Sequence, residues 1–498
     1  MKTPLLISLF ALLGLLTACG SNSSSTPSGT GTGTFSNASL KGPYAYQISG
    51  TDLTTGASYR ESGVLTADGN GNLTGGTDDF AESATGLSTN STTGTYSVAN
   101  DGTGGMSINF ANGSLNFTLT MVSTTEFYMA EADTGAIGAG RAQAQTASAL
   151  PATPSGTFVF RLHTNTASAG SSSLVGALTV ASGTVSGSDD VIRASIFDNN
   201  TGAPLTLTGS FSAPAAIGRG LGSLSDSSGV TNNVIYYIVD ASHLLLMEND
   251  SGIIGIGAAT GQSGAPFSAA SLNGSYAFGS HADDTSGLNA VRTVGVFTSA
   301  GNGAISTGSL DSVVDGTAYA AAGVSGSYTT AANGRAAVTL TVQNIGVALQ
   351  VFYLVSTSEA YFLTDNTSKV EDGTVQQQAA TSFTASTLNG QYAFVMNGYN
   401  LNPLYLSRVG WISWNGSGTI NLNEVANSGQ IGVAATLNQP GILSGSYTVG
   451  ANGRTTATVN SLSVNPNDLV FYLVSGSSAY VLQNDTGYEI AGFMKLQP

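Results

Sequence analysis

The chain has few charged side chains. Only 8% of its 498 residues are Asp, Glu, Lys or Arg, whereas soluble proteins usually carry about a quarter. The 13 basic residues are dispersed, and 29 acidic residues give a formal charge of −16. Proteins that bind nucleic acid need clustered Lys and Arg to displace phosphate counterions. We therefore expect no nucleic-acid partner.

The usual signatures of enzymes are also missing. The sequence has no Gly-x-Ser-x-Gly elbow and no phosphate loop followed by a helix. Its three histidines, His163, His243 and His281, are interpreted as lying at unrelated repeat positions without a ligand-spaced partner. Zinc needs three or four clustered ligands. We predict structural or surface histidines, no metal, no cofactor and no enzymatic activity.

Cysteine occurs once, which excludes an internal disulfide. The single Cys19 follows Lys2 and an apolar segment, residues 5–16, that is too short to span a bilayer as a helix. Residues 16–19 read Leu-Thr-Ala-Cys, which resembles the lipobox of bacterial lipoproteins. An ordinary signal peptide with a chance cysteine is the alternative.

The lipobox resemblance implies cleavage before Cys19, a diacylglyceryl group on its sulfur and an acyl chain, such as palmitate, on the new N-terminus. Two or more lipid chains anchor a protein stably. In such lipoproteins Asp after the cysteine often implies retention at the inner membrane. Gly20 stands there instead, so we expect an exported protein on the outer membrane or cell surface.

Three landmarks repeat along the rest of the chain with a period of about 116 residues. Gly-x-aromatic triplets open each module and recur at its middle, and an Asx closes a late strand. The opening glycines are Gly42, Gly156, Gly274 and Gly390, the middle ones Gly94, Gly209, Gly326 and Gly445, and the Asx residues Asp133, Asp250, Asn366 and Asp485. The length of the repeat is that of a small domain. It predicts modules at 37–147, 148–264, 265–380 and 381–498. The lipobox segment predicts a signal peptide at 1–19, and the small polar residues that follow predict a flexible tether at 20–36.

Within a module, apolar residues alternate with polar ones, as in Leu115, Phe117, Leu119 and Met121. Alternation places one face of a strand on a core and the other, here rich in Thr, Ser and Asn, in water. Asn-Gly and Asp-Gly pairs supply tight turns. The last module predicts strands near 391–397, 404–414, 418–425, 429–436, 443–449, 454–461, 468–475, 478–484 and 488–496.

A meander of this length removes its edges by closing. We therefore predict an all-β chain of four eight-stranded up-and-down barrels, with β-sandwiches as the alternative. The opening Gly-x-aromatic resembles the Gly-x-Trp start of lipocalin and avidin-type barrels, and the whole pattern resembles tandem-repeat lipoproteins of environmental bacteria. Phe352, Leu354, Phe471 and Leu473 are predicted to point inward and fill the interiors.

Acidic residues follow the second hairpin of most modules, as in Asp78 with Asp79, Asp189 with Asp190, and Asp311, where the fourth module has Glu424. Neighbours on a strand face opposite sides, which argues against a shared glycosidase site. We predict solvated turn acids, with metal binding and catalysis as the alternatives. Residues 68–72, Asp-Gly-Asn-Gly-Asn, resemble part of a calcium loop but lack its Glu and helices, so we predict a hairpin turn.

Both tryptophans, Trp411 and Trp414, lie in the fourth module near Tyr405. Three residues apart on a strand, they face opposite sides, so we predict one in the interior and one in water. The exposed ring, with Tyr405, is a candidate ligand contact; simple core filling is the alternative.

These patterns predict a monomeric, non-enzymatic surface lipoprotein whose modules form a stalk or a multivalent array for glycans or other surface polymers. A lipocalin-like small-ligand binder and a carbohydrate-active enzyme are the alternatives.

Overall fold

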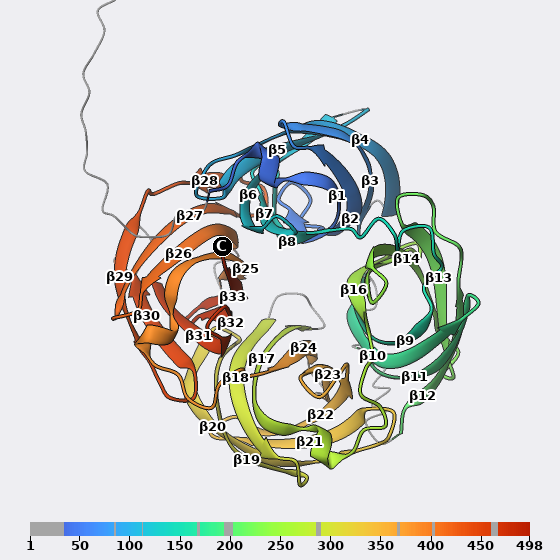
Figure 1. Cartoon of the computed structure of the whole chain (residues 1–498), viewed down its shortest axis with the longest axis vertical. Helices are drawn as coiled ribbons and strands as arrows, with labels where there is room; N and C mark the ends of the chain where they lie inside the picture. The colour runs from blue at the N-terminus through green and yellow to red at the C-terminus, as the bar shows by residue number, and fades with distance from the viewer. Residues whose placement is uncertain are drawn as a thin grey trace, which may run out of the picture. The chain divides into compact units, whose positions relative to one another are not determined.

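The computed structural model describes residues 34–83, 86–111, 113–166, 170–193, 203–284, 290–365, 369–400, 404–459 and 467–498. Cys19, Asn366 and most of the predicted tether lie outside these residues. The described chain forms four antiparallel β-barrels in sequence order, which confirms the predicted fold class (Figure 1). In the described part of the chain, no helix has the length and apolar character needed to cross a membrane.

The strand bounds follow the repeat. Barrel 1 contains β1 (Lys41–Asp52), β2 (Ser58–Asp68), β3 (Asn72–Glu82), β4 (Gly86–Val98), β5 (Thr103–Phe110), β6 (Gly113–Ser123), β7 (Glu126–Glu131) and β8 (Ala136–Ala144). Barrel 2 contains β9 (Gly156–Thr166), β10 (Gly170–Ala181), β11 (Thr184–Arg193), β12 (Leu205–Phe211), β13 (Arg219–Asp226), β14 (Thr231–Asp240), β15 (His243–Glu248) and β16 (Ile253–Gly261).

The other two barrels repeat this order. Barrel 3 contains β17 (Asn273–Asp284), β18 (Ala290–Ala300), β19 (Ala304–Val314), β20 (Thr317–Thr330), β21 (Arg335–Val342), β22 (Gly346–Leu354), β23 (Glu359–Asp365) and β24 (Lys369–Gln377). Barrel 4 contains β25 (Asn389–Asn400), β26 (Tyr405–Asn415), β27 (Thr419–Gly429), β28 (Thr436–Asn438), β29 (Leu443–Val449), β30 (Arg454–Val459), β31 (Asn467–Ser475), β32 (Ser478–Gln483) and β33 (Tyr488–Leu496).

Each barrel closes by pairing its first strand with its last, as β1 does with β8. Barrel 4 differs in one place. Both β28 and β29 pair with β27, so together they take the place of one strand. The strand predicted at 429–436 is wrong, because β27 extends to Gly429 and residues 430–435 form a turn.

The barrel interiors are packed with side chains from their own strands. Phe117, Leu119 and Met121 lie in the core of barrel 1, as their alternation predicts. Phe352 and Leu354 fill barrel 3, and barrel 4 is filled in the same way by Phe471 and Leu473. A filled interior stabilises each barrel through apolar burial.

Two kinds of glycine explain the repeated Gly-x-aromatic landmarks. The opening glycines, such as Gly42 (φ 101°) and Gly390 (φ 122°), have left-handed backbone angles that disfavour other residues. The mid-module glycines instead have no room for a side chain. A Cβ on Gly94 would lie 2.0 Å from the carbonyl oxygen of Ser107, and one on Gly326 would lie 2.1 Å from that of Thr339.

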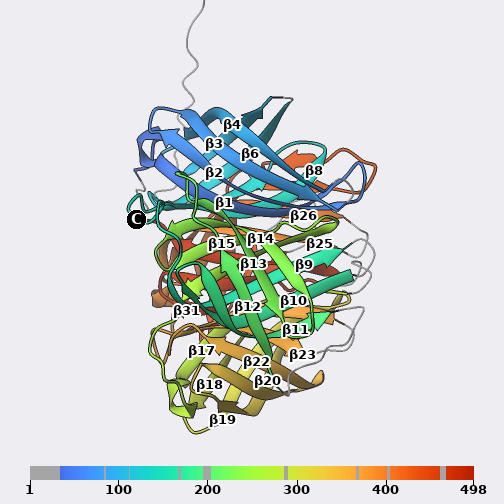
Figure 2. The ribbon, with the colours of Figure 1, turned by 90° about the vertical axis from the view of Figure 1, so that its right-hand side faces the viewer.

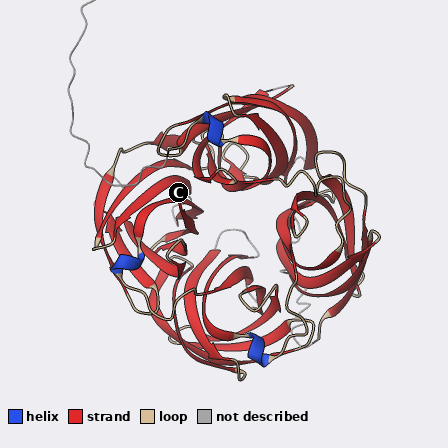
Figure 3. Cartoon of the chain, viewed as in Figure 1, coloured by secondary structure: helices blue, strands red, loops and turns tan. Residues whose placement is uncertain are grey.

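The mid-module tyrosines hold a short 3-10 turn at the start of three barrels. These turns are η1 (Asn37–Ser39), η2 (Ala269–Ser271) and η3 (Ala385–Thr387), shown as helix in Figure 3. In barrel 1 the Tyr96 hydroxyl donates to the carbonyl of Leu40 at 2.7 Å. Barrel 2 has Phe211 at this position and no such turn among its described residues.

The barrels of residues 34–498 contact one another in a closed cycle. Apolar clusters join barrel 1 to barrel 2, barrel 2 to barrel 3, barrel 3 to barrel 4, and barrel 4 back to barrel 1. In Figure 2, β1 lies beside β14 and β15 of the next barrel, and these strands are in contact. The contacting strands bury both faces, so the prediction that every outward face meets water is wrong there.

A glutamine at the end of each barrel forms the same contact with the following barrel. Its side-chain amide donates to two backbone carbonyls; Gln145, for example, bonds to Ile217 at 3.1 Å and Ile238 at 2.6 Å. Gln262 and Gln378 repeat this on barrels 3 and 4. Gln497, next to the last residue of the chain, bonds to Met121 of barrel 1 at 2.6 Å. Barrel 4 therefore contacts barrel 1 in the same way as each other barrel contacts the next one in the sequence.

Candidate functional site

The predicted tryptophan site is largely covered in the structure. Trp414 is 2% exposed in the core of barrel 4, edge-on to Tyr447 and Phe471. Trp411 is 8% exposed, and its indole nitrogen donates to Asp101 of barrel 1 at 3.0 Å. The prediction that one ring stands in water is wrong, because the outward face of β26 meets barrel 1.

Tyr405 is partly buried against the small apolar cluster of Leu53, Ile137 and Ala435. Its ring lies 6.0 Å from that of Tyr399. The ring contacts of Tyr405 in the described part of the chain include neither Trp411 nor Trp414. A ligand contact through these residues stays an untested prediction, and the burial of both indoles leaves little aromatic face for it.

The acids after the second hairpin are buried, so the prediction of solvated turn acids is wrong. Asp78 and Asp79 are 1% and 0% exposed, and they do face opposite sides of β3. Asp78 points into barrel 1, where it accepts a hydrogen bond from Tyr46 at 2.8 Å. Asp79 points outward and pairs with Arg219 of barrel 2 at 2.7 Å. The surface expected to meet water is a barrel–barrel interface.

The interior of barrel 1 carries a group of buried acids. Glu61, Asp78 and Glu131 are each 1% exposed or less. Burial, together with the charge of Asp78, raises the pKa of Glu61, and burial also raises the pKa of Asp78, to about 6. Burial, with the charge of Asp133, raises the pKa of Glu131. All three carboxyl groups are thus buried.

The turn at residues 68–72 is the predicted hairpin link between β2 and β3. Asp68 accepts backbone hydrogen bonds from Asn70 at 2.6 Å and Asn72 at 3.0 Å. Hydrogen bonds from the side chain of Asn72 and from these backbone groups lower the pKa of Asp68 to about 2. Its carboxylate is therefore used to hold the turn.

Three of the four interfaces share one charged motif, which we call the Asp–Arg–Tyr triad. An outward Asp of one barrel accepts a bidentate pair of hydrogen bonds from an Arg of the next barrel. It also accepts a hydrogen bond from the hydroxyl of a Tyr beside that Arg. The triads are Asp79–Arg219–Tyr237, Asp190–Arg335–Tyr353 and Asp311–Arg454–Tyr472. Such paired bonds are strong and directional.

In the middle triad, Arg335 lies 2.7 Å from both carboxylate oxygens of Asp190, and the Tyr353 hydroxyl lies 2.7 Å from one of them. Asp190 is 2% exposed. Burial and then the Asp190 charge raise the pKa of Tyr353 well above its ordinary value, so the phenol stays a donor. Side-chain hydrogen bonding to Asp190 raises the pKa of Arg335.

The interface between barrels 4 and 1 lacks the triad at all three positions. The strand registers place Val425, Thr103 and Thr120 where the other interfaces have Asp, Arg and Tyr. Trp411 bonds to Asp101 instead, and Lys495 pairs with Glu126 at 2.6 Å. Closure of the cycle thus rests on a different set of side chains.

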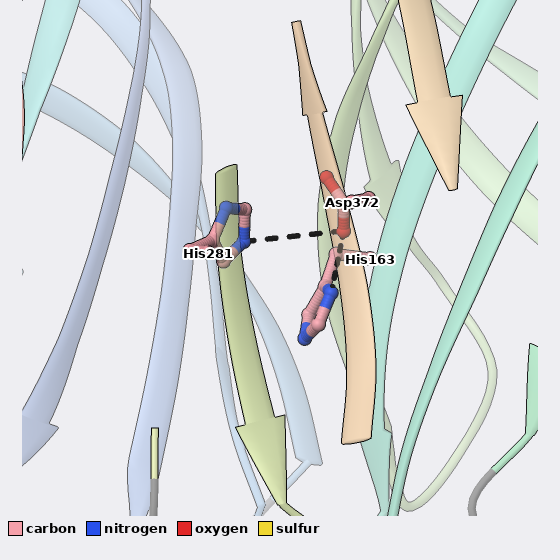
Figure 4. A group of neighbouring side chains, drawn as sticks. All are labelled: His163, His281 and Asp372. Atoms are coloured by element: carbon pink, nitrogen blue, oxygen red, sulfur yellow. Dashed lines mark hydrogen bonds and ion pairs between the residues drawn. The ribbon is translucent and has the colours of Figure 1, made fainter. Parts of the chain in front are cut away.

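A second polar group, which we call the histidine–aspartate cluster, lies between barrels 2 and 3 (Figure 4). It consists of His163 on β9, His281 on β17 and Asp372 on β24. The Nδ1 of His163 lies 2.8 Å from Oδ2 of Asp372, and the Nε2 of His281 lies 4.0 Å from the same oxygen. These are the described His, Cys, Asp and Glu residues that could jointly hold a metal ion.

Two further side chains orient Asp372. Arg161 lies 2.9 Å from Oδ1, and the Ser173 hydroxyl donates to Oδ2 at 2.6 Å. Burial would raise the pKa of Asp372, but the charges of His281, His163 and Arg161 together with the hydrogen bond from His163 hold it well below its ordinary range. The cluster therefore presents an ionised carboxylate beside two imidazoles.

The interpretation of the histidines as unrelated in position is wrong for two of them. His163 and His281 each stand seven residues after the opening glycine of their module, Gly156 and Gly274. Their rings lie 5.1 Å apart across the interface of barrels 2 and 3. His243 stands elsewhere in its module, on β15.

No protein-family model and no curated protein match the chain. A search of solved structures finds a chain described as intact Ap-TbpB with its N and C lobes. The similarity has a TM-score of 0.18 and 8% sequence identity, and it covers 76% of this chain and 86% of that chain. At that level of similarity the comparison assigns neither a family nor a function.

Proposed function

We propose that the chain is a monomeric, non-enzymatic lipoprotein of the bacterial cell surface, whose four barrels together form one closed binding platform. The anchor is inferred from the Leu-Thr-Ala-Cys sequence at residues 16–19. The platform is inferred from one observation above the others: Gln497 of the last barrel bonds to the first barrel as the other glutamines bond to their successors. A closed cycle fits a platform better than the extended stalk considered from the sequence.

The filled interiors favour ligand contact on the outer surface. Tyr46, Tyr236, Phe352 and Phe471 each occupy the middle of a different barrel and are at most 2% exposed. A lipocalin-like binder would need that space for its ligand. Outside, large apolar side chains are exposed on the hairpin of β21 and β22, where Val347 is 67% exposed. Surface polymers such as glycans are the partner class that fits repeated outer surfaces.

A carbohydrate-active enzyme fits less well. The paired carboxylates that could act as acid and base point to opposite sides of their strands, and both members are covered. Asp79, Asp190 and Asp311 are each bound to an Arg and a Tyr of the next barrel. These acids serve assembly.

Replacing Cys19 by serine should abolish lipid attachment in cells that express the full chain. Thioether formation needs the cysteine sulfur, and two or more lipid chains are what hold such a protein on a membrane. We expect radioactive palmitate to label the parent and not the variant, and protease added to intact cells to digest the parent. Undiminished labelling of the variant would contradict the anchor, and complete protection of the parent from protease would contradict the surface location.

A further inference from the structure

We propose that the histidine–aspartate cluster between barrels 2 and 3 is a binding site for a divalent transition-metal ion of the Zn²⁺ class. The donors would be one nitrogen from each of His163 and His281 and one oxygen of Asp372. This inference is independent of the lipid anchor and of the platform proposed above. It assigns the cluster a ligand that neither the repeat nor the fold requires.

The donor set suits this class of ion. Two imidazole nitrogens and one carboxylate oxygen are ligands that Zn²⁺, Ni²⁺ and Cu²⁺ accept readily, whereas Ca²⁺ and Mg²⁺ prefer oxygen alone. Three protein ligands leave a fourth position for water, as in open zinc sites. The chain offers no competing thiol among its described residues, because Cys19 is its single cysteine.

The separations suit a shared ion. The three donor atoms lie within 4.8 Å of one another. A tetrahedral ion with bonds of about 2.0–2.2 Å sets its ligands roughly 3.3 Å apart. The 2.8 Å from His163 to Asp372 and the 4.0 Å from His281 to Asp372 lie on either side of that value. Side-chain adjustments would bring all three donor atoms to such separations, with the ion taking the place between His163 and Asp372 that a hydrogen-bonding proton now has.

The surroundings hold the carboxylate in place and leave a way in. Arg161 pairs with Oδ1 of Asp372, and Oδ2 faces both imidazoles, so Oδ2 is the oxygen that an ion would take, beside the hydrogen bond that Oδ2 accepts from Ser173. Hydrogen bonds to a ligating carboxylate commonly orient it. The side chains of His163 and Asp372 are 5% and 1% exposed, whereas that of His281 is 38% exposed. An ion can therefore arrive from the side of His281.

Occupancy would link two barrels. His163 belongs to barrel 2, and both His281 and Asp372 belong to barrel 3. The equivalent residues of the other barrels are Ser49 and Asn397, which meet each other across the interface of barrels 1 and 4 at 3.4 Å. One pair of equivalent positions thus carries histidines that meet across an interface, and the other carries neutral side chains. The neutral pair supplies natural replacements for a test.

The test is calorimetric titration of ZnCl₂ into residues 34–498, purified with a tag that lacks histidine and dialysed against EDTA. We expect one Zn²⁺ per chain. His281→Asn, which installs the residue of barrel 4, should weaken binding by at least about tenfold. His243→Ala, which removes the histidine outside the cluster, should bind as the parent does. Equal binding by His281→Asn and the parent, or no binding by the parent, would overturn the proposal.

Two measurements on the parent alone keep the test independent of how the variants fold. Co²⁺ in place of Zn²⁺ should give the visible bands of a four-coordinate ion with nitrogen ligands. Zn²⁺ should also raise the melting temperature, because an ion that binds only the folded state stabilises it by mass action. A Co²⁺ spectrum identical to that of the free ion would count against the site even if the variants unfolded.

Discussion

Replacing Asp190 by valine should destabilise the folded chain by about 3–5 kcal/mol, the usual cost of removing one partner from a buried ion pair. The substitution removes the carboxylate that pairs with Arg335 and accepts the hydroxyl hydrogen bond of Tyr353. Valine is the residue that the interface of barrels 4 and 1 has at this position, as Val425. The measurement is urea denaturation of residues 34–498 followed by far-UV circular dichroism.

The control removes the whole triad. Asp190→Val combined with Arg335→Met and Tyr353→Phe removes all three polar groups of the triad together, and such apolar replacements are often close to neutral. We expect this triple variant to regain most of the stability lost by the single one. If the single and triple variants were equally unstable, the loss would come from altered packing and the triad would not explain the contact.

Trp414→Ala should also be strongly destabilising, by about 3–5 kcal/mol, because it leaves a cavity in the core of barrel 4. The indole of Trp414 lies 4.7 Å from the ring of Tyr447 and 5.1 Å from that of Phe471, centroid to centroid. These rings come from other strands and cannot all move inward to fill the space. The readout is the same urea denaturation.

Trp411→Val is the matched control, because barrel 1 has Val64 at the equivalent position. This variant loses the hydrogen bond to Asp101 and part of an interface but opens no core cavity. We expect a loss of about 1–2 kcal/mol, within the ordinary range for point substitutions. A loss for Trp411→Val as large as that for Trp414→Ala would mean that the interface of barrels 4 and 1 holds as much of the stability as a barrel core.

The barrel fold could be predicted from the sequence because its determinants are local. Alternation at Phe117, Leu119 and Met121 sets the inward face, and glycine turns set the hairpins. The strand predicted at 429–436 is wrong because β27 continues to Gly429 and the residues after it link β27 to β28. Local alternation at Ile431 and Val433 does not distinguish such a link from a strand.

The barrel interfaces needed a signal of a different kind. Residues 234–239 and 351–355 are apolar on both faces, and such continuous runs are typical of strands covered on both sides. The alternation of apolar and polar residues, which describes Ala336 to Val342 well, does not reveal strands that are buried on both faces. Tyr237 and Tyr353 occupy the outward positions in these runs, and both are buried against the preceding barrel.

The Asp and Arg partners of the triads could be identified from the repeat, because their positions are shifted by one module relative to each other. The outward Asp is present in modules 1, 2 and 3 and the Arg in modules 2, 3 and 4. A residue type shifted by one module is what pairing between successive modules produces. The histidine–aspartate cluster could not be found in this way. The shared position of His163 and His281 is visible in the sequence, but their approach to Asp372 depends on how two barrels pack.

Barrel 4 closes the cycle by packing against barrel 1. The most direct measurement uses residues 34–498, which contain no cysteine, with Ser49→Cys and Asn397→Cys introduced together. The native side chains at these positions meet at 3.4 Å although 348 residues separate them. Under oxidation, or with a short bis-maleimide, the monomer should form an internal link that gives a faster band on a denaturing gel, and neither single variant should. A folded double variant that stays monomeric and keeps both thiols free would contradict the closed cycle.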